Sequence, residues 1–180
     1  MGKTLMSVLD EMVKTLKKQL DALDAVIPKI DKHERELFNK CVDALTHNDE
    51  IWKARAILYA NECAEVRKLL KRMLVSRYVI ERVLLILEAV EDLQDLAVQG
   101  ATVVQLLSIS RKQLGGIVPE VSYYLGVVEE KLSKIIVEVE GSSGLILPFE
   151  SKEVEKILKQ AEEQVDIKLN ERPKIPKEAM

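Results

Sequence analysis

The sequence is poor in the residues from which most enzymes and metal proteins build a site. Its 180 residues include two histidines, two cysteines and seven aromatic residues. His33 and His47 have no Cys, His or carboxylate partner at zinc-motif spacing, and the glycines form neither GxGxxG nor GxxxxGK. We therefore expect no enzyme activity, no metal and no cofactor. Cys41 and Cys63 have no CxxC spacing, and we expect them to be buried and unbridged.

Long hydrophobic runs are also missing. The most apolar stretch, Tyr78 to Val90, is interrupted by charged residues and is shorter than the ~20 apolar residues that a bilayer span needs. Asp10 and Glu11 fall where the apolar part of a signal peptide would lie. We expect an intracellular protein without a membrane span.

What the chain does have is helical periodicity, in a composition of 47% apolar and 32% charged residues. Apolar residues recur at steps of three, four or seven from Leu5 to Leu45, which predicts one long helix, with either a kink at Pro28 or a helix that begins after it. Residues 46–50, THNDE, combine cap residues with acids and predict a tight turn. The sequence therefore predicts an all-α protein with a long antiparallel helical hairpin.

The second helix of the hairpin is predicted from about Asp49 to about Val98. Besides its first apolar stripe, this helix carries a second one. A helix that is apolar on two faces needs more than one partner, so later segments or another molecule must cover the second stripe. This expected assembly or autoinhibition surface consists of Val79, Val83, Ile86 and Val90.

Shorter elements are predicted after the hairpin. Gly100 is expected to break the helical pattern, and proline residues near the end predict an extended, exposed tail. The expected organisation is a basic hairpin over residues 1–100, shorter helices over 101–140, a flexible linker over 141–150, and a last helix with the proline-containing tail over 151–180.

Charge is distributed unevenly along the chain. Residues 1–77 hold 15 Lys and Arg against 12 Asp and Glu, whereas residues 78–180 hold 12 against 18. The absence of interleaved aromatics and of a reading-helix motif makes nucleic acid a poor partner, and anionic lipid or an acidic protein face fits better. The expected membrane or polymer face consists of Lys14, Lys17, Lys18, Arg67, Lys68, Lys71, Arg72 and Arg77.

Two helical segments and a later stretch resemble one protein family. Asp31 to Leu45 (DKHERELFNKCVDAL), Lys53 to Leu69 (KARAILYANECAEVRKL) and Leu114 to Gly144 are similar to the archaeal ESCRT-III proteins, the Cdv-type cell-division family. The resemblance runs from about residue 8 to about residue 176 and suggests a short paralogue without a winged-helix extension.

The resemblance implies a specific function. Members of the family assemble with themselves and with paralogues into filaments on membranes, which they constrict or sever in cell division or vesicle budding. It also implies a cytoplasmic protein at the inner face of the plasma membrane, at the division site. An AAA+ ATPase would take the filament apart through an MIT domain that grips Pro173, Lys174, Ile175 and Pro176.

One position departs from the family pattern, and one alternative stays open. The family usually has an apolar residue before the first proline of the tail motif, where this chain has Arg172. The alternative is a non-polymerising helical-bundle adaptor or regulatory protein, which would bury its surplus stripe internally and remain a monomer or dimer.

Overall fold

The computed structural model describes residues 4–140 and 152–180, which form five α-helices, a short 3₁₀ helix and no strand. The all-α fold predicted from the sequence is confirmed. The predicted linker, residues 141–150, and Ser151 lie outside the described residues. The helices are α1 (Leu5–Leu45), α2 (Glu50–Glu88), α3 (Leu93–Leu114), α4 (Pro119–Glu140) and α5 (Lys152–Asn170), followed by η1 (Lys177–Ala179).

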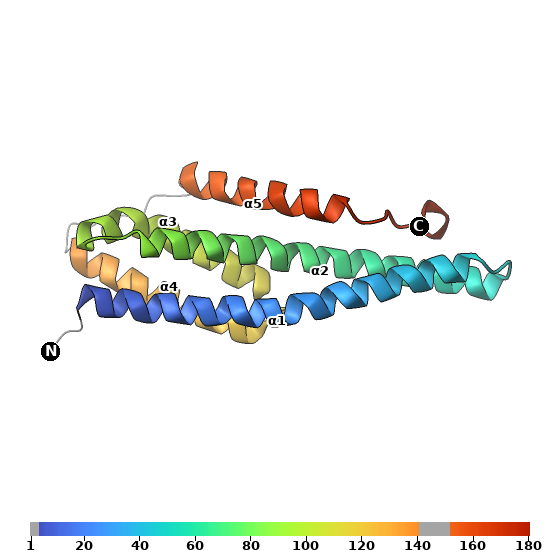
Figure 1. The fold of residues 1–180 in the computed structure, drawn as a ribbon, viewed down its shortest axis with the longest axis horizontal. Helices are drawn as coiled ribbons and strands as arrows, with labels where there is room; N and C mark the ends of the chain where they lie inside the picture. The colour runs from blue at the N-terminus through green and yellow to red at the C-terminus, as the bar shows by residue number, and fades with distance from the viewer. Residues whose placement is uncertain (1–3, 141–151) are drawn as a thin grey trace.

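The first two helices form the predicted antiparallel hairpin (Figure 1). At ~1.5 Å per residue, the 41 residues of α1 span about 60 Å. Thr4 caps the start of α1, and the Asp49 side chain accepts a hydrogen bond from the Ile51 backbone N–H to start α2. The helix α1 begins at Leu5 and includes Pro28, so the alternative in which the helix begins after this proline is wrong.

The second helix is shorter than predicted. It ends at Glu88, and α3 begins at Leu93, whereas the sequence predicts one helix to about Val98. The side chain of Asp92 accepts a hydrogen bond from the Asp95 backbone N–H and so caps α3. The intervening short loop lets α3 turn back along α2.

Gly100 does not break a helix either, because it lies inside α3. A Cβ at this position would collide with the side chain of Ile136 on α4. Glycine here allows α3 and α4 to pack closely, rather than ending the helix.

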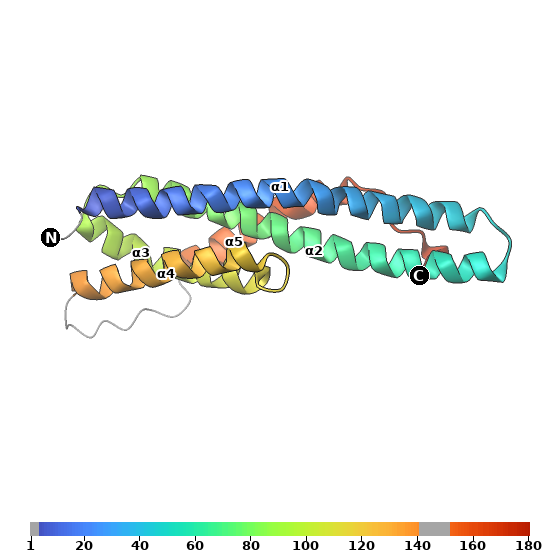
Figure 2. The ribbon, with the colours of Figure 1, turned by 90° about the horizontal axis from the view of Figure 1, so that it is seen from below.

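The rear helices cover only one half of the hairpin (Figure 2). Helix α3 packs on α2 and α4, α4 also packs on α1, and α5 lies along α2 and α3. The main core is formed where these helices meet. The helical hairpin continues beyond α3 and α4 to its tip, where η1 packs against it. No described helix is long and apolar enough to cross a membrane.

A second, small core fills the tip of the hairpin. Its buried side chains are small, and the tail completes it through Ala179 and, half-buried, Ile175. Because the side chains of the hairpin are small, α1 and α2 can approach closely and leave room for the tail. The buried hairpin residues of this tip core are Cys41, Ala44, Ala56 and Ala60.

Candidate assembly and membrane-binding surfaces

The surplus apolar stripe of α2 is covered by the chain itself. Val79, Val83 and Val90 are buried in the main core, and Ile86 is half-buried against it. The covering helices are the rear ones, since α3 packs along α2. The sequence left open whether later segments of the chain or another molecule cover this stripe. In the structure, later segments of the chain cover it.

The predicted basic face is divided by the fold. Lys68 and Arg72 are exposed on α2, whereas Arg67 and Lys71 are half-buried. Lys17 lies beside Glu88, with Nζ and Oε1 3.8 Å apart. Because Glu88 follows Lys68 by 20 residues of α2, roughly 30 Å along the axis, the lysines of α1 form a separate cluster.

Several of these cations have carboxylate partners within the chain. Lys71 Nζ lies 2.9 Å from Asp166 Oδ1 on α5. Lys68 Nζ lies 3.1 Å from Glu65 Oε1 of its own helix, in a pair that is exposed on both sides. Exposed ion pairs of this kind contribute about 0–1 kcal/mol, so solvent and other anions compete with them.

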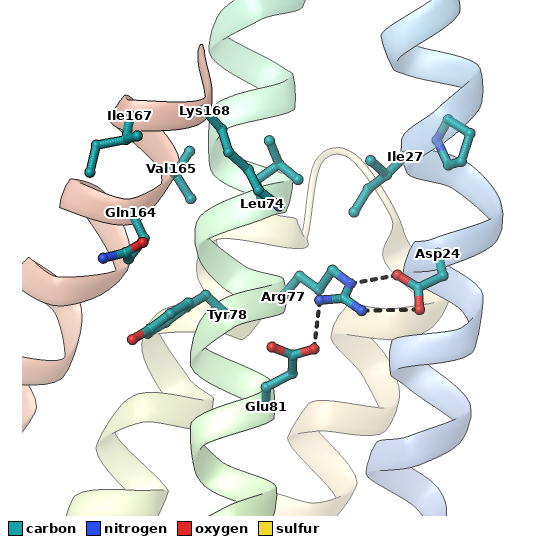
Figure 3. Close-up of a pocket in the computed structure, with 11 residues that line it drawn as sticks. Asp24, Ile27, Leu74, Arg77, Tyr78, Glu81, Gln164, Val165, Ile167 and Lys168 are labelled. Atoms are coloured by element: carbon teal, nitrogen blue, oxygen red, sulfur yellow. Dashed lines mark hydrogen bonds and ion pairs between the residues drawn. The ribbon is translucent and has the colours of Figure 1, made fainter. Parts of the chain in front are cut away.

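Arg77 lies in a groove of about 490 Å³ between α1, α2 and α5. Its guanidinium pairs with Asp24 of α1 and with Glu81 one turn along α2 (Figure 3). The Asp24 hydrogen bond is the largest cause that raises the pKa of Arg77 above its ordinary value. Val165 of α5 lines the other side of this groove, while the Arg77 guanidinium turns toward α1 (Figure 3).

The sequence predicts a tail that projects into solvent, but part of the tail packs against the hairpin. Pro173 and Lys174 are exposed, but Ile175 and Pro176 are half-buried, and Ala179 is fully buried in the tip core. The backbone is extended at Pro176, just before η1, with φ −56° and ψ 132°, which is the polyproline II region open to a proline. The expectation of an exposed tail is therefore wrong for its second half, because an apolar pocket at the hairpin tip receives it.

A buried carboxylate anchors this tail. The Glu34 side chain is only 2% exposed, and its two oxygens accept hydrogen bonds from Arg67 Nε and Arg172 Nη1, both at 2.6 Å. Arg172 also pairs with Asp31, and Arg67 Nη2 donates a 2.7 Å hydrogen bond to the carbonyl of Pro173. Two guanidiniums thus neutralise two carboxylates at the junction of α1, α2 and the tail.

The two cysteines are free and buried, as predicted. The Cys63 thiol donates a 3.5 Å hydrogen bond to Glu34 Oε1. Burial raises the pKa of the Cys63 thiol to about 11; Arg67 opposes the rise, and the Glu34 carboxylate adds to it. Among the described residues, no group of three His, Cys, Asp or Glu side chains could hold a metal ion.

Two cell division proteins of Sulfolobus acidocaldarius are similar to this chain. Cell division protein B1 is 30% identical over 165 residues, which cover 89% of this chain and 75% of that protein. The chain belongs to the Cdv-type ESCRT-III family. Cell division protein B is 27% identical over 175 residues, 96% of this chain and 66% of that protein. No family model matches the chain, and no solved structure matches it.

Sequence reasoning missed the acidic partners of this Cdv-type protein. Glu34 on α1 and Asp166 on α5 hold Arg67 and Lys71, which the sequence assigned to a free surface. Asp31 and Glu34 also hold Arg172 of the tail. One signal was present: Glu34 falls on the apolar stripe of α1, between Ile30 and Leu37, where a carboxylate must be paired once it is buried.

Proposed function

We propose that this protein is a filament-forming ESCRT-III-like subunit that binds membrane and constricts or severs it during archaeal cell division or vesicle budding. Its partners would be further copies, paralogous subunits, an anionic membrane surface and an AAA+ ATPase with an MIT domain, and no nucleic acid. It would act in the cytoplasm, peripherally on the inner face of the plasma membrane at the division site. Its membership of a family of cell division proteins supports this proposal.

The observation that carries the proposal is that the C-terminal elements cover the predicted apolar stripe and also part of the predicted basic face. Helix α3 packs along α2, whose stripe residues Val79 and Val83 are buried in the main core. Asp166 of α5 pairs with Lys71, and the Pro173 carbonyl of the tail accepts a hydrogen bond from Arg67. Release of the rear helices would expose an apolar face for a neighbouring subunit and free cations for lipid at the same time. A molecule whose binding surfaces are covered together can be switched by a single opening.

Membrane contact would start from the cations that are already exposed. Lys68 and Arg72 lie next to the half-buried Arg67 and Lys71, so opening of α5 would extend a small basic patch into a larger one. Each basic residue near an anionic surface contributes about 1 kcal/mol. Lys14, Lys17 and Lys18 would supply a second contact at the other end of the hairpin.

The tail motif would recruit the ATPase. Pro173 and Pro176 fix an extended backbone, and Ile175 between them supplies an apolar anchor for a groove between the helices of an MIT domain. Arg172, Lys174 and Lys177 would add attraction to an acidic groove.

The test compares variants that differ only in which side of α5 is changed. The Val165 side chain lies on the inner face of α5 and is buried, whereas the side chain of Ile167, on the same helix, is 59% exposed. Val165→Asp is expected to loosen α5, so that the protein sediments with anionic liposomes and forms filaments in negative stain at lower concentration than the unchanged chain. Ile167→Asp, the matched control, should behave as the unchanged chain does. If no form assembles or binds liposomes at any concentration tested, the proposal fails.

The alternative of a non-polymerising helical-bundle adaptor has one observation in its favour. The stripe predicted for assembly is already buried, with Val79 and Val83 at 1% and 0% exposure. An adaptor with a satisfied core needs no neighbour to cover this stripe. A constant monomer or dimer mass across all variants and lipid conditions would favour this alternative.

A further inference from the structure

The outer face of α4 exposes large apolar side chains to solvent. Helix α4 runs along the outside of the molecule and packs on α3 and α1 (Figure 2). Its inner face is buried in the main core through Leu125, Leu132 and Ile136. On the opposite side of the helix, the side chains of Tyr123 and Val137 are each 66% exposed. Scattered apolar residues are ordinary on a protein surface, so the pattern in which these occur decides what they mean.

The exposed apolar residues of α4 belong to a regular stripe. Positions 123, 127, 130, 134 and 137 follow one another at steps of four and three, which places them along one face of the helix, away from the core. Steps of four and three are also the spacing with which two helices pack against each other. We call this set the α4 stripe; it consists of Tyr123, Val127, Glu130, Lys134 and Val137, of which Val127 is half-buried and the others are exposed.

The α4 stripe is complementary to a second copy of itself. Glu130 Oε1 and Lys134 Nζ lie 3.2 Å apart, and their side chains are 70% and 72% exposed. In an antiparallel pair of α4 helices, Glu130 of each copy can lie opposite Lys134 of the other. The same register places Val127 of each copy opposite Val137 of the other, three residues further out. A parallel pair would instead set each charge against its own like charge, which is unfavourable.

A second helix can also come close to this face. A groove of about 710 Å³ lies beside the α4 stripe, and small side chains of α4 line it, namely Ser122, Gly126 and Ser133. The distance between the axes of packed helices depends on the side chains at the contact, so small ones permit a close approach. Arg111 and Glu129 also line the groove, but they pair with each other at 2.9 Å and bring no unpaired charge to a contact there.

We propose that two copies of this protein dimerise through the α4 stripe, with the two α4 helices antiparallel about a two-fold axis. The α4 stripe is separate from the buried stripe of α2, so this contact forms while the rear helices stay in place. It goes beyond the proposed function and needs neither filament nor membrane. Each copy contributes one helix of 22 residues, about 33 Å long, so the interface is small and the dimer should be weak.

Sedimentation equilibrium of the full chain without lipid, from micromolar to millimolar concentration, tests the contact. The mass of the unchanged chain should rise toward that of a dimer and stop there, because a two-fold contact uses each stripe once. Val137→Asp places a charge opposite Val127 of the other copy and should raise the dissociation constant of the dimer at least ~10-fold. The matched control is Val98→Asp on α3, because Val98 is 69% exposed outside the α4 stripe; this variant should dimerise as the unchanged chain does.

An exchange of charge tests the antiparallel register. Glu130→Lys leaves two lysines at the centre of the stripe, and Lys134→Glu leaves two glutamates. Each variant alone should dimerise at least ~10-fold more weakly than the unchanged chain, because like charges then oppose each other. In a parallel pair, like charges already oppose each other in the unchanged chain, so neither variant would weaken it.

Mixing these two variants separates the interface from the stability of the helix. An equimolar mixture should form heterodimers with the affinity of the unchanged dimer, because every charge again meets an opposite charge. Each chain keeps its own substitution in the mixture, so a change in folding cannot produce this recovery. Circular dichroism should show the same helix content for all variants, since every substituted side chain is exposed.

Three results would overturn the inference. They are a monomer mass at every concentration, a Val137→Asp chain that dimerises as tightly as the unchanged chain, and a mixture that associates no more tightly than its two components. Filament formation on liposomes is a separate measurement. A dimer without filaments would support the inference while contradicting the proposed function, and filaments without a dimer would do the reverse.

Discussion

Arg172 and Glu34 stand 138 residues apart in sequence, and their side chains meet with Nη1 and Oε2 2.6 Å apart. This contact joins the C-terminal tail to the second half of the first helix. Neither partner can be removed without leaving the other partly unpaired in a buried place.

Arg172→Ala should therefore destabilise the protein more than loss of an exposed arginine does. Hydrogen bonds to charged groups contribute roughly 1.5–3 kcal/mol each, so we expect a loss of about 2 kcal/mol in the free energy of unfolding. The control is Arg35→Ala, because Arg35 is 70% exposed and its i,i+4 pair with Asp31 contributes about 0.3–0.5 kcal/mol. Urea unfolding measures both, and equal losses would contradict the buried role of Arg172.

The close packing at Gly100 gives a second prediction. Gly100→Ala places a Cβ against the side chain of Ile136, and such overpacking typically costs about 1–3 kcal/mol. Against the ~1 kcal/mol gain in helix propensity, we expect a net loss of up to about 2 kcal/mol in the free energy of unfolding. A Cβ at Gly116 would meet nothing within 4 Å, so Gly116→Ala should be nearly neutral. Thermal unfolding compares the two, and recovery of stability when Ile136→Val accompanies Gly100→Ala would identify the contact. A Gly100→Ala protein as stable as the unchanged chain would contradict it.

The Cys63 thiol predicts how stability depends on pH. Its pKa is about 11 in the fold against an ordinary value of 9.0, so the folded chain holds this proton more tightly than the unfolded one. The stabilisation is complete below pH 9 and is lost as the pH rises through 11. Between pH 9 and 11, Cys63→Ala should lose less free energy of unfolding than the unchanged chain. Because the two proteins share all other titrating groups, the contribution of those groups drops out of the comparison. Parallel curves for the two proteins would contradict the raised pKa.

Lipid binding should depend on position rather than on charge alone. Lys68→Gln with Arg72→Gln removes two exposed cations of α2, and at about 1 kcal/mol each we expect roughly 30-fold weaker binding to anionic liposomes. Lys131→Gln with Lys134→Gln removes the same charge from the exposed face of α4 and should have a small effect. Cosedimentation at two salt concentrations measures both, since added salt should weaken the binding that remains. Similar losses in the two double variants would assign binding to net charge instead.

Much of the helical pattern was predictable because it rests on local chemistry. The cap residues of the turn at 46–50 and the apolar steps of α1 locate the hairpin. The end of α2 was not predictable in this way. Val90 and Leu93 keep the apolar spacing of a helix across the loop that separates α2 from α3, so periodicity alone does not mark the break.

The candidate surfaces were predicted only in part, because exposure depends on tertiary packing. The cations of α2 were found, but their partners lie far away in the chain: Lys71 meets Asp166, and Arg67 meets Glu34. No local pattern joins such residues. The buried position of Glu34 in an apolar stripe was the one sign that a distant cation had to reach it.

The uneven coverage of the hairpin makes the molecule thick at one end and thin at the other. Near the start of α1, up to five helices share one large core, whereas the tip is two helices joined by small side chains and one short tail. Local stability follows buried apolar area. Opening of the tip should therefore cost less free energy than opening of the thick end, and amide hydrogens near the tip should exchange with solvent faster. Local unfolding of the hairpin should therefore start at its tip, where the tail packs, and proceed toward the thick end.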